Sequence, residues 1–223
     1  MAVLNSFVDD RTKLSPISPR DSTAGRRTPM QSLIAWPITR RMAYQVELRR
    51  ARIFLSHLSP HLTPNTRILD LGAGSCVICH FLTKSGMCVT PLDIRNLSLV
   101  HGVNPMIYGG SRIPFQGEQF DVTLIVTVLH HTSDPESIIC EARRVSRRII
   151  IVEDVYSTTL HKSMTLLEDS LANFEFCNHP HSNKTDTEWQ RLFPRLGLRL
   201  EAVDYFTDAP IFQHALYCLE RQD

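Results

Sequence analysis

The chain of 223 residues lacks several features that would each have assigned it to a class. No run of about 18 apolar residues occurs, so we expect no membrane-spanning helix. Its 24 Lys and Arg are balanced by 23 Asp and Glu, and a formal net charge of +1 gives no long-range field for holding nucleic acid. The first residues lack the basic-then-apolar layout of a secretory signal. We therefore expect a cytoplasmic protein without a nucleic-acid partner.

The six cysteines do not form a spaced framework of disulfide or metal pairs. Four fall in segments predicted to be buried, where reduced cysteine behaves as a small apolar residue, as expected in a reducing compartment. Cys76–His80 has the CxxCH spacing of haem attachment, but the run lies in a predicted helix, so we expect no haem. His179 and His181 near Cys177 lack a second matched pair, so we also expect no metal site.

Composition divides the chain into a tail and a domain. Residues 1–30 carry few large apolar groups and are predicted to form a flexible N-terminal tail, and residues 31–223 are predicted to form one domain. Mixed apolar and basic positions at 31–60 predict a helical cap over the sheet or the mouth of a pocket. The following arginines are interpreted as the solvent-facing side of this cap: Arg41, Arg49, Arg50 and Arg52.

After the cap, strand and helix patterns alternate. Strands are predicted at 67–71, 87–94, 105–108, 120–129, 147–154, 198–206 and 211–221. Helices are predicted at 76–85, 135–145 (capped by Asp134), 159–173 and 185–196 (capped by Thr185 or Asp186). The pattern predicts an α/β fold with a Rossmann-like, mainly parallel seven-stranded sheet, an antiparallel C-terminal hairpin and helices on both faces. Residues 155–185 are predicted to be an insert on the substrate side.

A glycine turn and a distant carboxylate carry the strongest chemical signal. The first predicted strand ends in Asp70-Leu71-Gly72-Ala73-Gly74-Ser75, where bare backbone lets a cofactor approach before the next helix begins. Asp93 closes the second strand, 19 residues after Gly74. At that spacing a carboxylate can accept hydrogen bonds from two ribose hydroxyls, so the pattern indicates a nucleoside-containing cofactor.

Three segments of the chain carry a family resemblance: ILDLGAGS, PLDI and IPFQGEQFDVTLIVTVLHHTSDPESIICEARRVSRRIIIVED. Over roughly residues 65–155 the chain resembles the class I S-adenosylmethionine-dependent methyltransferases. Within them it is similar to the branch that acts on small molecules, quinones and lipids. The resemblance implies S-adenosyl-L-methionine as the cofactor and a small-molecule acceptor.

The resemblance also implies roles for residues at the matching positions. Asp70 and the glycine turn would shape the bay for the methionine end of the cofactor, Asp93 would hold the ribose, and Ile94 would pack on the adenine. Segment 109–113 would wrap the adenine edge, and segment 127–129 would form the floor beneath the sulfonium. The implied cofactor-binding residues are Asp70, Gly72, Ala73, Gly74, Asp93, Ile94, Gly110, Ser111, Thr127 and Val128.

Two positions depart from the family pattern. Cys76 stands where the family often has a third glycine, which would tighten the approach to the cofactor. Gly109 stands where many relatives carry an acid, so the adenine amino group would lose a side-chain acceptor, a loss of about 1 kcal/mol if backbone or water substitutes.

Catalytic candidates lie at the carboxyl ends of two predicted strands. His130 or His131 could accept a proton from an acceptor hydroxyl, or the pair could simply fix a loop. Glu153 could orient the acceptor or take its proton, and so could Asp154, although capping and solvation explain both equally well.

Two other functions were weighed against methyl transfer. A nicotinamide-dependent oxidoreductase would need a glycine where Val77 stands. A catalytically degenerate methyltransferase fold that binds or regulates would be consistent with Cys76 and Gly109. The sequence favours an S-adenosylmethionine-dependent methyltransferase and does not fix its oligomeric state.

Overall fold

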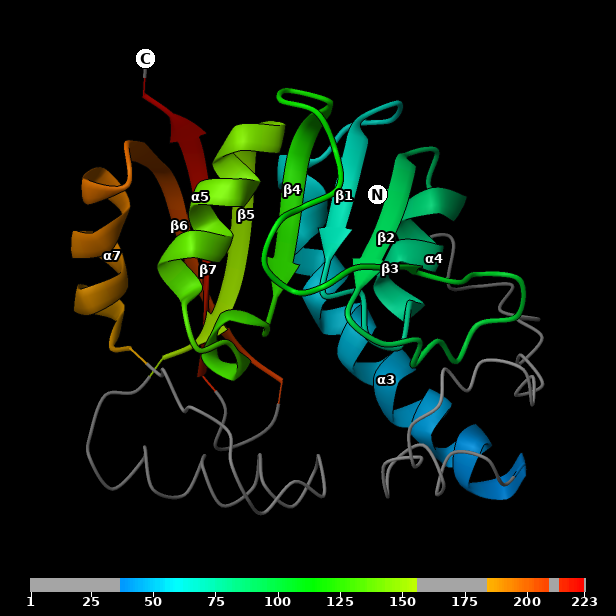
Figure 1. Ribbon diagram of the computed structural model, residues 1–223. Helices are drawn as coiled ribbons and strands as arrows, with labels where there is room; N and C mark the ends of the chain where they lie inside the picture. The colour runs from blue at the N-terminus through cyan, green and yellow to red at the C-terminus, as the bar shows by residue number, and fades with distance from the viewer. Residues whose placement is uncertain (1–36, 156–183, 209–212, 223) are drawn as a thin grey trace.

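A seven-stranded sheet forms the centre of the molecule (Figure 1). The computed structural model describes residues 37–155, 184–208 and 213–222. The strands are β1 (Arg67–Leu71), β2 (Cys88–Asp93), β3 (Met106–Ile107), β4 (Phe120–Val126), β5 (Ser146–Asp154), β6 (Leu198–Thr207) and β7 (Gln213–Arg221). Their order across the sheet is β3-β2-β1-β4-β5-β7-β6. The first five strands pair in parallel, whereas β7 is antiparallel to both of its neighbours, β5 and β6. The predicted sheet and hairpin are confirmed.

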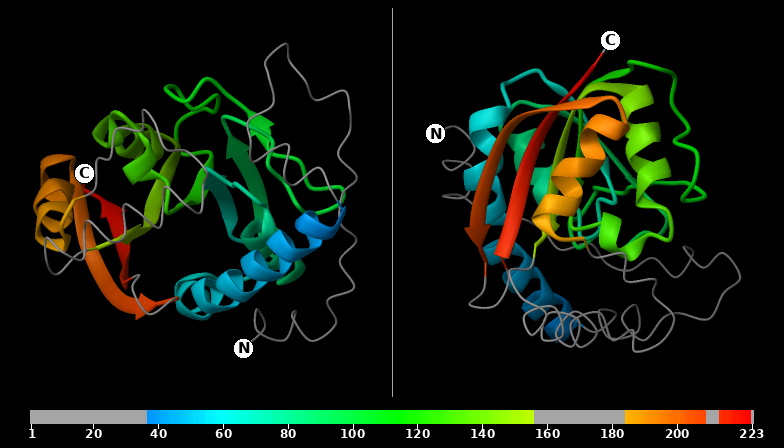
Figure 2. Two further views of the ribbon diagram at one scale, coloured as in Figure 1. Left: turned by 90° about the horizontal axis from the view of Figure 1, so that it is seen from below. Right: turned by 90° about the vertical axis from the view of Figure 1, so that its left-hand side faces the viewer.

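Helices cover both faces because the parallel strands are apolar on both sides (Figure 2). The helices are α3 (Pro37–Leu58), α4 (Val77–Lys84), α5 (Pro135–Val145) and α7 (Asp186–Arg195), with 3-10 turns η1 (Ser59–His61) and η2 (Leu129–His131). One buried cluster joins α3 and α4 to the sheet, and a second cluster joins α5 and α7 to the opposite face. Among the described helices, none is long and apolar enough to cross a membrane.

The helix starts follow local capping chemistry. The Asp134 carboxylate accepts a hydrogen bond from the Ser137 backbone N–H at 3.0 Å, with Pro135 in the first turn of α5. Helix α7 begins with a capping box in which the Thr185 hydroxyl and the Glu188 carboxylate each accept the other's backbone N–H. Both predicted helices are therefore placed by short-range signals.

Strand β4 is shorter than predicted. The apolar run continues to Leu129, but the strand ends at Val126 because Thr127 adopts a φ of 51° and turns the chain. Within the predicted cap, Pro37–Leu58 forms one helix, α3. The predicted tail, the helix at 159–173 and the polar loop with His179 and His181 lie outside the described residues, as does most of the predicted insert at 155–185.

The carboxyl ends of β1, β2, β4, β5 and β6 meet at one edge of the sheet, together with the start of β7. In open α/β sheets this is the edge at which ligands bind.

Candidate cofactor and methyl-transfer site

The glycine turn after β1 contains two backbone conformations that favour glycine. Gly72 has a φ of 78° and Gly74 a φ of 49°. A Cβ on Gly72 would lie 2.4 Å from Cγ2 of Val128, so no larger residue fits without displacing that side chain. The Gly72 and Ala73 N–H groups donate to the Leu92 carbonyl, which ties the turn to β2. The turn is thus fixed beside the segment that follows β4.

Asp93, at the end of β2, reaches the glycine turn. Its Oδ2 accepts a hydrogen bond from Gly74 N at 2.8 Å, and its Oδ1 accepts one from Arg95 N at 3.1 Å. Asp70 lies at the end of β1 and is buried. Burial raises the pKa of Asp70 to about 7, and repulsion from Asp93 adds to the rise. Two acids therefore converge on the turn.

An exposed apolar side chain lies beside Asp93. Ile94 is 51% exposed, although Leu92 and Asp93 just before it are buried. Gly110 adopts a φ of 81°, and a Cβ there would lie 3.2 Å from Cγ2 of Ile94. Ser111 is exposed beside it. A Cβ on Gly109 would meet no atom within 4 Å, so the space that an acid would fill is open.

Cys76 has a backbone conformation that glycine would adopt more easily. Its φ is 58°, in the left-handed region, and its side chain is fully buried at the start of α4. The thiol of Cys79, one turn later, donates to the Cys76 carbonyl at 3.3 Å. Both sulfurs therefore belong to the packing of α4.

Glu153 holds the segment after β4 from beneath. Its Oε1 accepts hydrogen bonds from Val128 N at 2.9 Å and Leu129 N at 2.7 Å. Its Oε2 lies 2.6 Å from Nδ1 of His130, and Glu153 is only 1% exposed. These contacts explain the early end of β4, because the carboxylate takes the N–H groups that would have continued the ladder.

The two histidines have different surroundings. His130 is buried, whereas His131 is half-buried, with ring centroids 4.0 Å apart. Of the two histidines, His130 is the one for which a contact with Glu153 is described above, together with the backbone N–H groups of Val128 and Leu129. Asp154, the next residue, points to the other face of the sheet and pairs with His214.

Comparison with known proteins agrees with this geometry. Residues 69–149 match the model of a family described as a methyltransferase domain. Over these residues the chain is similar to methyltransferase domains. S-adenosylmethionine is the cofactor that this domain implies.

Three relatives show the range of the similarity. An uncharacterized protein of Methanocaldococcus jannaschii is 33% identical over 86 residues, which span 38% of this chain and 42% of that protein. A chain in the complex of the Haloferax volcanii Trm112 methyltransferase activator with the putative methyltransferase superposes with a TM-score of 0.67. That pair is 12% identical and covers 89% of this chain and 100% of the other.

The third relative is the magnesium protoporphyrin IX methyltransferase of Synechocystis with bound S-adenosylhomocysteine. It superposes with a TM-score of 0.57 at 15% identity, over 89% of this chain and 90% of the other. At these identities the two solved structures show the shared fold. The aligned part is less than half of the Methanocaldococcus jannaschii protein.

Residues that the sequence analysis did not identify contact the candidate site. On α3, the Glu47 carboxylate accepts a hydrogen bond from the Ser75 hydroxyl at 2.8 Å, and Arg50 Nη2 donates to Thr127 Oγ1 at 3.2 Å. The prediction that the α3 arginines face solvent is right for Arg41, Arg49 and Arg52 but wrong for Arg50. Arg50 flanks the buried stripe of α3, so its guanidinium reaches the edge of the sheet.

His214 was missed as well. It lies in an apolar strand on the same face as Leu216 and Cys218. A polar residue is unexpected at such a position, and the sequence could therefore have indicated a buried histidine here. Burial alone would lower the pKa of His214, but the carboxylates of Asp154 and Asp208 outweigh burial and raise it. Burial would raise the pKa of Asp154 and of Asp208, yet the neighbouring cations, above all His214, hold both below their ordinary value.

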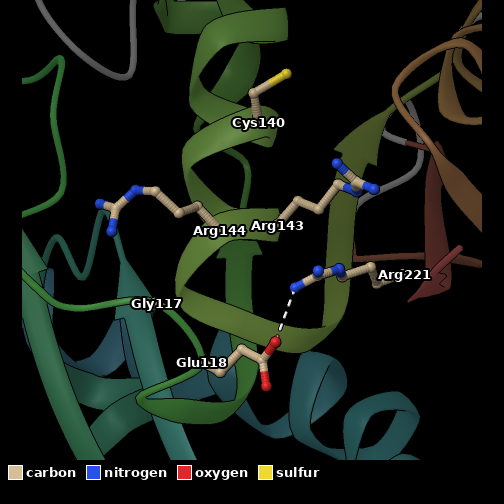
Figure 3. A pocket seen from close by; sticks show the side chains of 6 residues that line it. All are labelled: Gly117, Glu118, Cys140, Arg143, Arg144 and Arg221. Atoms are coloured by element: carbon tan, nitrogen blue, oxygen red, sulfur yellow. Dashed lines mark hydrogen bonds and ion pairs between the residues drawn. The ribbon is translucent and has the colours of Figure 1, made fainter. Parts of the chain in front are cut away.

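An open pocket of about 520 Å³ lies at the opposite edge of the sheet, away from the methyltransferase site (Figure 3). Its lining residues are Gly117, Glu118, Cys140, Arg143, Arg144 and Arg221. Arg143 donates to the carbonyls of Gly197 and Gln222, and Arg144 is bound to Glu141. These guanidiniums already bind backbone carbonyls and Glu141, so they hold the fold together.

Proposed function

We propose that this protein transfers a methyl group from S-adenosylmethionine to a small-molecule or lipid-like acceptor. The observation that carries the proposal is the contact between Asp93 and the glycine turn. An acid at the end of β2 reaches the backbone of Gly74, at the edge where nucleoside cofactors bind in such sheets.

The shape of the bay fits the cofactor. Gly72 leaves the backbone bare against Val128, and Asp93 presents carboxylate oxygens for ribose hydroxyls. The exposed side chain of Ile94 offers an apolar surface for adenine, beside Gly110 and Ser111. When bound, S-adenosylmethionine supplies a reactive methyl group on a sulfonium with a good leaving group. The protein's part is then to align the acceptor and exclude water, which can contribute roughly 7–11 kcal/mol.

His130 is the proposed general base, and Glu153 is its positioning residue. A histidine whose Nδ1 faces a carboxylate carries its proton on that nitrogen, which leaves the Nε2 lone pair able to take a proton. Glu153 also binds the backbone N–H groups of Val128 and Leu129, so ring and loop are held as one unit. This fixed orientation of the ring, and not a vacant Nε2, is what supports the proposed role of His130. His131, half-buried beside it, is proposed to line the acceptor side.

The acceptor pocket is proposed to form between α3 and the loop after His131, together with the segment around 155–185. The aromatic residues suggested for it, Tyr156, Phe174 and Phe176, lie outside the described residues. A degenerate binding or regulatory protein is the alternative. The positive φ of the turn glycines and the contact of Asp93 with Gly74 argue against a fold that has lost cofactor binding.

The proposal is tested by following S-adenosylhomocysteine formation from S-adenosylmethionine over a panel of phenols, quinols, carboxylic acids and amines. The expected result is turnover with at least one acceptor class, lost in Asp93→Ala and reduced on the order of 10²–10⁴-fold in His130→Ala. Cofactor binding without turnover on every acceptor class would instead support the degenerate alternative.

A further inference from the structure

Thr127 is held in a backbone conformation that its side chain opposes. Its φ of 51° lies in the left-handed region, which β-branched residues rarely enter. Such a conformation persists only where the surroundings fix it, and it occurs most often at functional sites. Two contacts fix it here: the Thr127 N–H donates to the Val152 carbonyl at 2.7 Å, and the hydroxyl accepts from Arg50.

Arg50 is the first member of a chain of alternating charges. Its Nε donates to Asp208 Oδ2 at 3.1 Å, while Nη2 reaches Thr127. The other oxygen of Asp208 lies 2.8 Å from Nε2 of His214, and Nδ1 of His214 lies 2.7 Å from Asp154 Oδ1. The imidazole N–H groups are not aligned on these oxygens, so we describe the two pairs as ion pairs. The chain joins α3 to the ends of β5, β6 and β7.

Aromatic rings shield the inner members of this charge chain from water, whereas the Arg50 side chain stays 37% exposed. The ring of Phe54 lies 4.9 Å from that of His214, and the ring of Phe206 lies 5.1 Å from it. The Arg50 guanidinium sits 4.9 Å from the centre of the Phe54 ring. The His214 side chain is 1% exposed, and both paired carboxylates are nearly as well covered. Asp208 bridges Arg50 and His214, and His214 bridges Asp208 and Asp154. Loss of one member therefore removes a counter-charge from its neighbour, so the chain acts as a unit.

The position of Thr127 matters because its neighbour abuts the glycine turn. Val128 is the residue that a Cβ on Gly72 would strike, so the conformation at Thr127 sets how far Val128 reaches over the turn. A change in the Arg50 contact would therefore move the floor beneath the bay.

We infer that Arg50, Asp208, His214 and Asp154 form a positioning network that locks Thr127 and so sets the cofactor floor between β4 and the glycine turn. This inference rests on the proposed function only in taking S-adenosylmethionine as the molecule that binds against this floor. The lock itself is a property of the protein without ligand.

The first test measures amide hydrogen exchange of Thr127 in the full, ligand-free chain. In Arg50→Met we expect the Thr127 amide to exchange at least tenfold faster than in the wild type, relative to the Leu124 amide in the middle of β4. The control is Arg49→Met, an exposed arginine of the same helix, which should leave the ratio unchanged. A rise shared equally by Leu124 would mean that Arg50 only stabilises the whole sheet, and it would overturn the inference.

Two smaller substitutions, at Thr127 itself, keep the test valid if Arg50→Met does not fold. Thr127→Val removes the hydroxyl but keeps the branched shape, so the amide of residue 127 should again exchange faster relative to the Leu124 amide. Thr127→Ser keeps the hydroxyl and should show the same ratio as the wild type. Calorimetric titration with S-adenosylhomocysteine should show at least fivefold weaker binding in Thr127→Val and in Arg50→Met than in Arg49→Met. Unchanged affinity in both would contradict the floor role. If the wild type does not bind S-adenosylhomocysteine, the proposed function fails. The ratio of amide exchange at Thr127 and Leu124 still tests whether the network fixes Thr127.

Discussion

Replacing Asp70 by Asn should make the ligand-free protein more stable at neutral pH and flatten its stability profile. The pKa of the buried carboxyl is raised from 3.8 to about 7, by burial and by Asp93. The folded state therefore binds this proton more tightly than the unfolded state does. The stabilisation is complete below about pH 4 and is lost as the pH rises through about 7.

The expected magnitude follows from that shift. Each pKa unit corresponds to about 1.4 kcal/mol, so ionisation of Asp70 lowers the free energy of unfolding by about 3 kcal/mol between pH 5 and pH 8. The amide of Asp70→Asn does not titrate, and every other group is shared by both proteins. Wild type should therefore lose about 3 kcal/mol more than the variant over this range.

Urea unfolding at pH 5, 6, 7 and 8, followed by circular dichroism, measures this difference directly. Parallel stability profiles for wild type and Asp70→Asn would refute the reasoning, because they would mean that Asp70 keeps an ordinary pKa in the folded state. A cation placed beside Asp70 would also lower its pKa. Binding of S-adenosylmethionine near pH 7 should accordingly release protons, seen as calorimetric heats that depend on the ionisation enthalpy of the buffer.

Two further predictions concern glycines of the bay. Gly72→Ala should destabilise the protein by about 1–3 kcal/mol, because the new Cβ meets Val128 in a left-handed backbone, and adding Val128→Ala should recover part of that loss in thermal unfolding. Two additive single effects would show that the two side chains do not meet. Gly109→Asp places an acceptor in open space and should tighten S-adenosylhomocysteine binding about fivefold, equivalent to about 1 kcal/mol, as measured by calorimetry. Unchanged or weaker binding would mean that no adenine amino group lies there.

Features with local causes could be predicted from the sequence. The run Arg67–Leu71 forms β1 with the predicted bounds, because five apolar-rich residues followed by a glycine turn leave little choice. The capping box at Thr185 placed α7 within a residue. The order of strand, glycine turn, helix, strand and terminal acid also follows the sequence, and it places Asp93 within hydrogen-bond distance of Gly74.

Features with distant partners could not be predicted. The end of β4 at Val126 depends on Glu153, whose carboxylate captures backbone N–H groups 24 and 25 residues earlier. The contact of Arg50 with Asp208 spans 158 residues, and no periodicity within α3 distinguishes Arg50 from its exposed neighbours. Long-range ion pairs leave little local pattern, so these residues emerge only from the fold.

The central claim is that the glycine turn and Asp93 bind S-adenosylmethionine. It is tested most directly by calorimetric titration of wild type, Asp93→Ala and Asp121→Ala with S-adenosylmethionine, S-adenosylhomocysteine and NAD. Asp121 is a matched control, since it pairs with Arg67 at the opposite edge of the sheet. Micromolar binding of both sulfur nucleosides, none of NAD, and at least tenfold weakening only in Asp93→Ala is the predicted result. Absence of binding to either sulfur nucleoside, or equal weakening in both variants, would contradict the account.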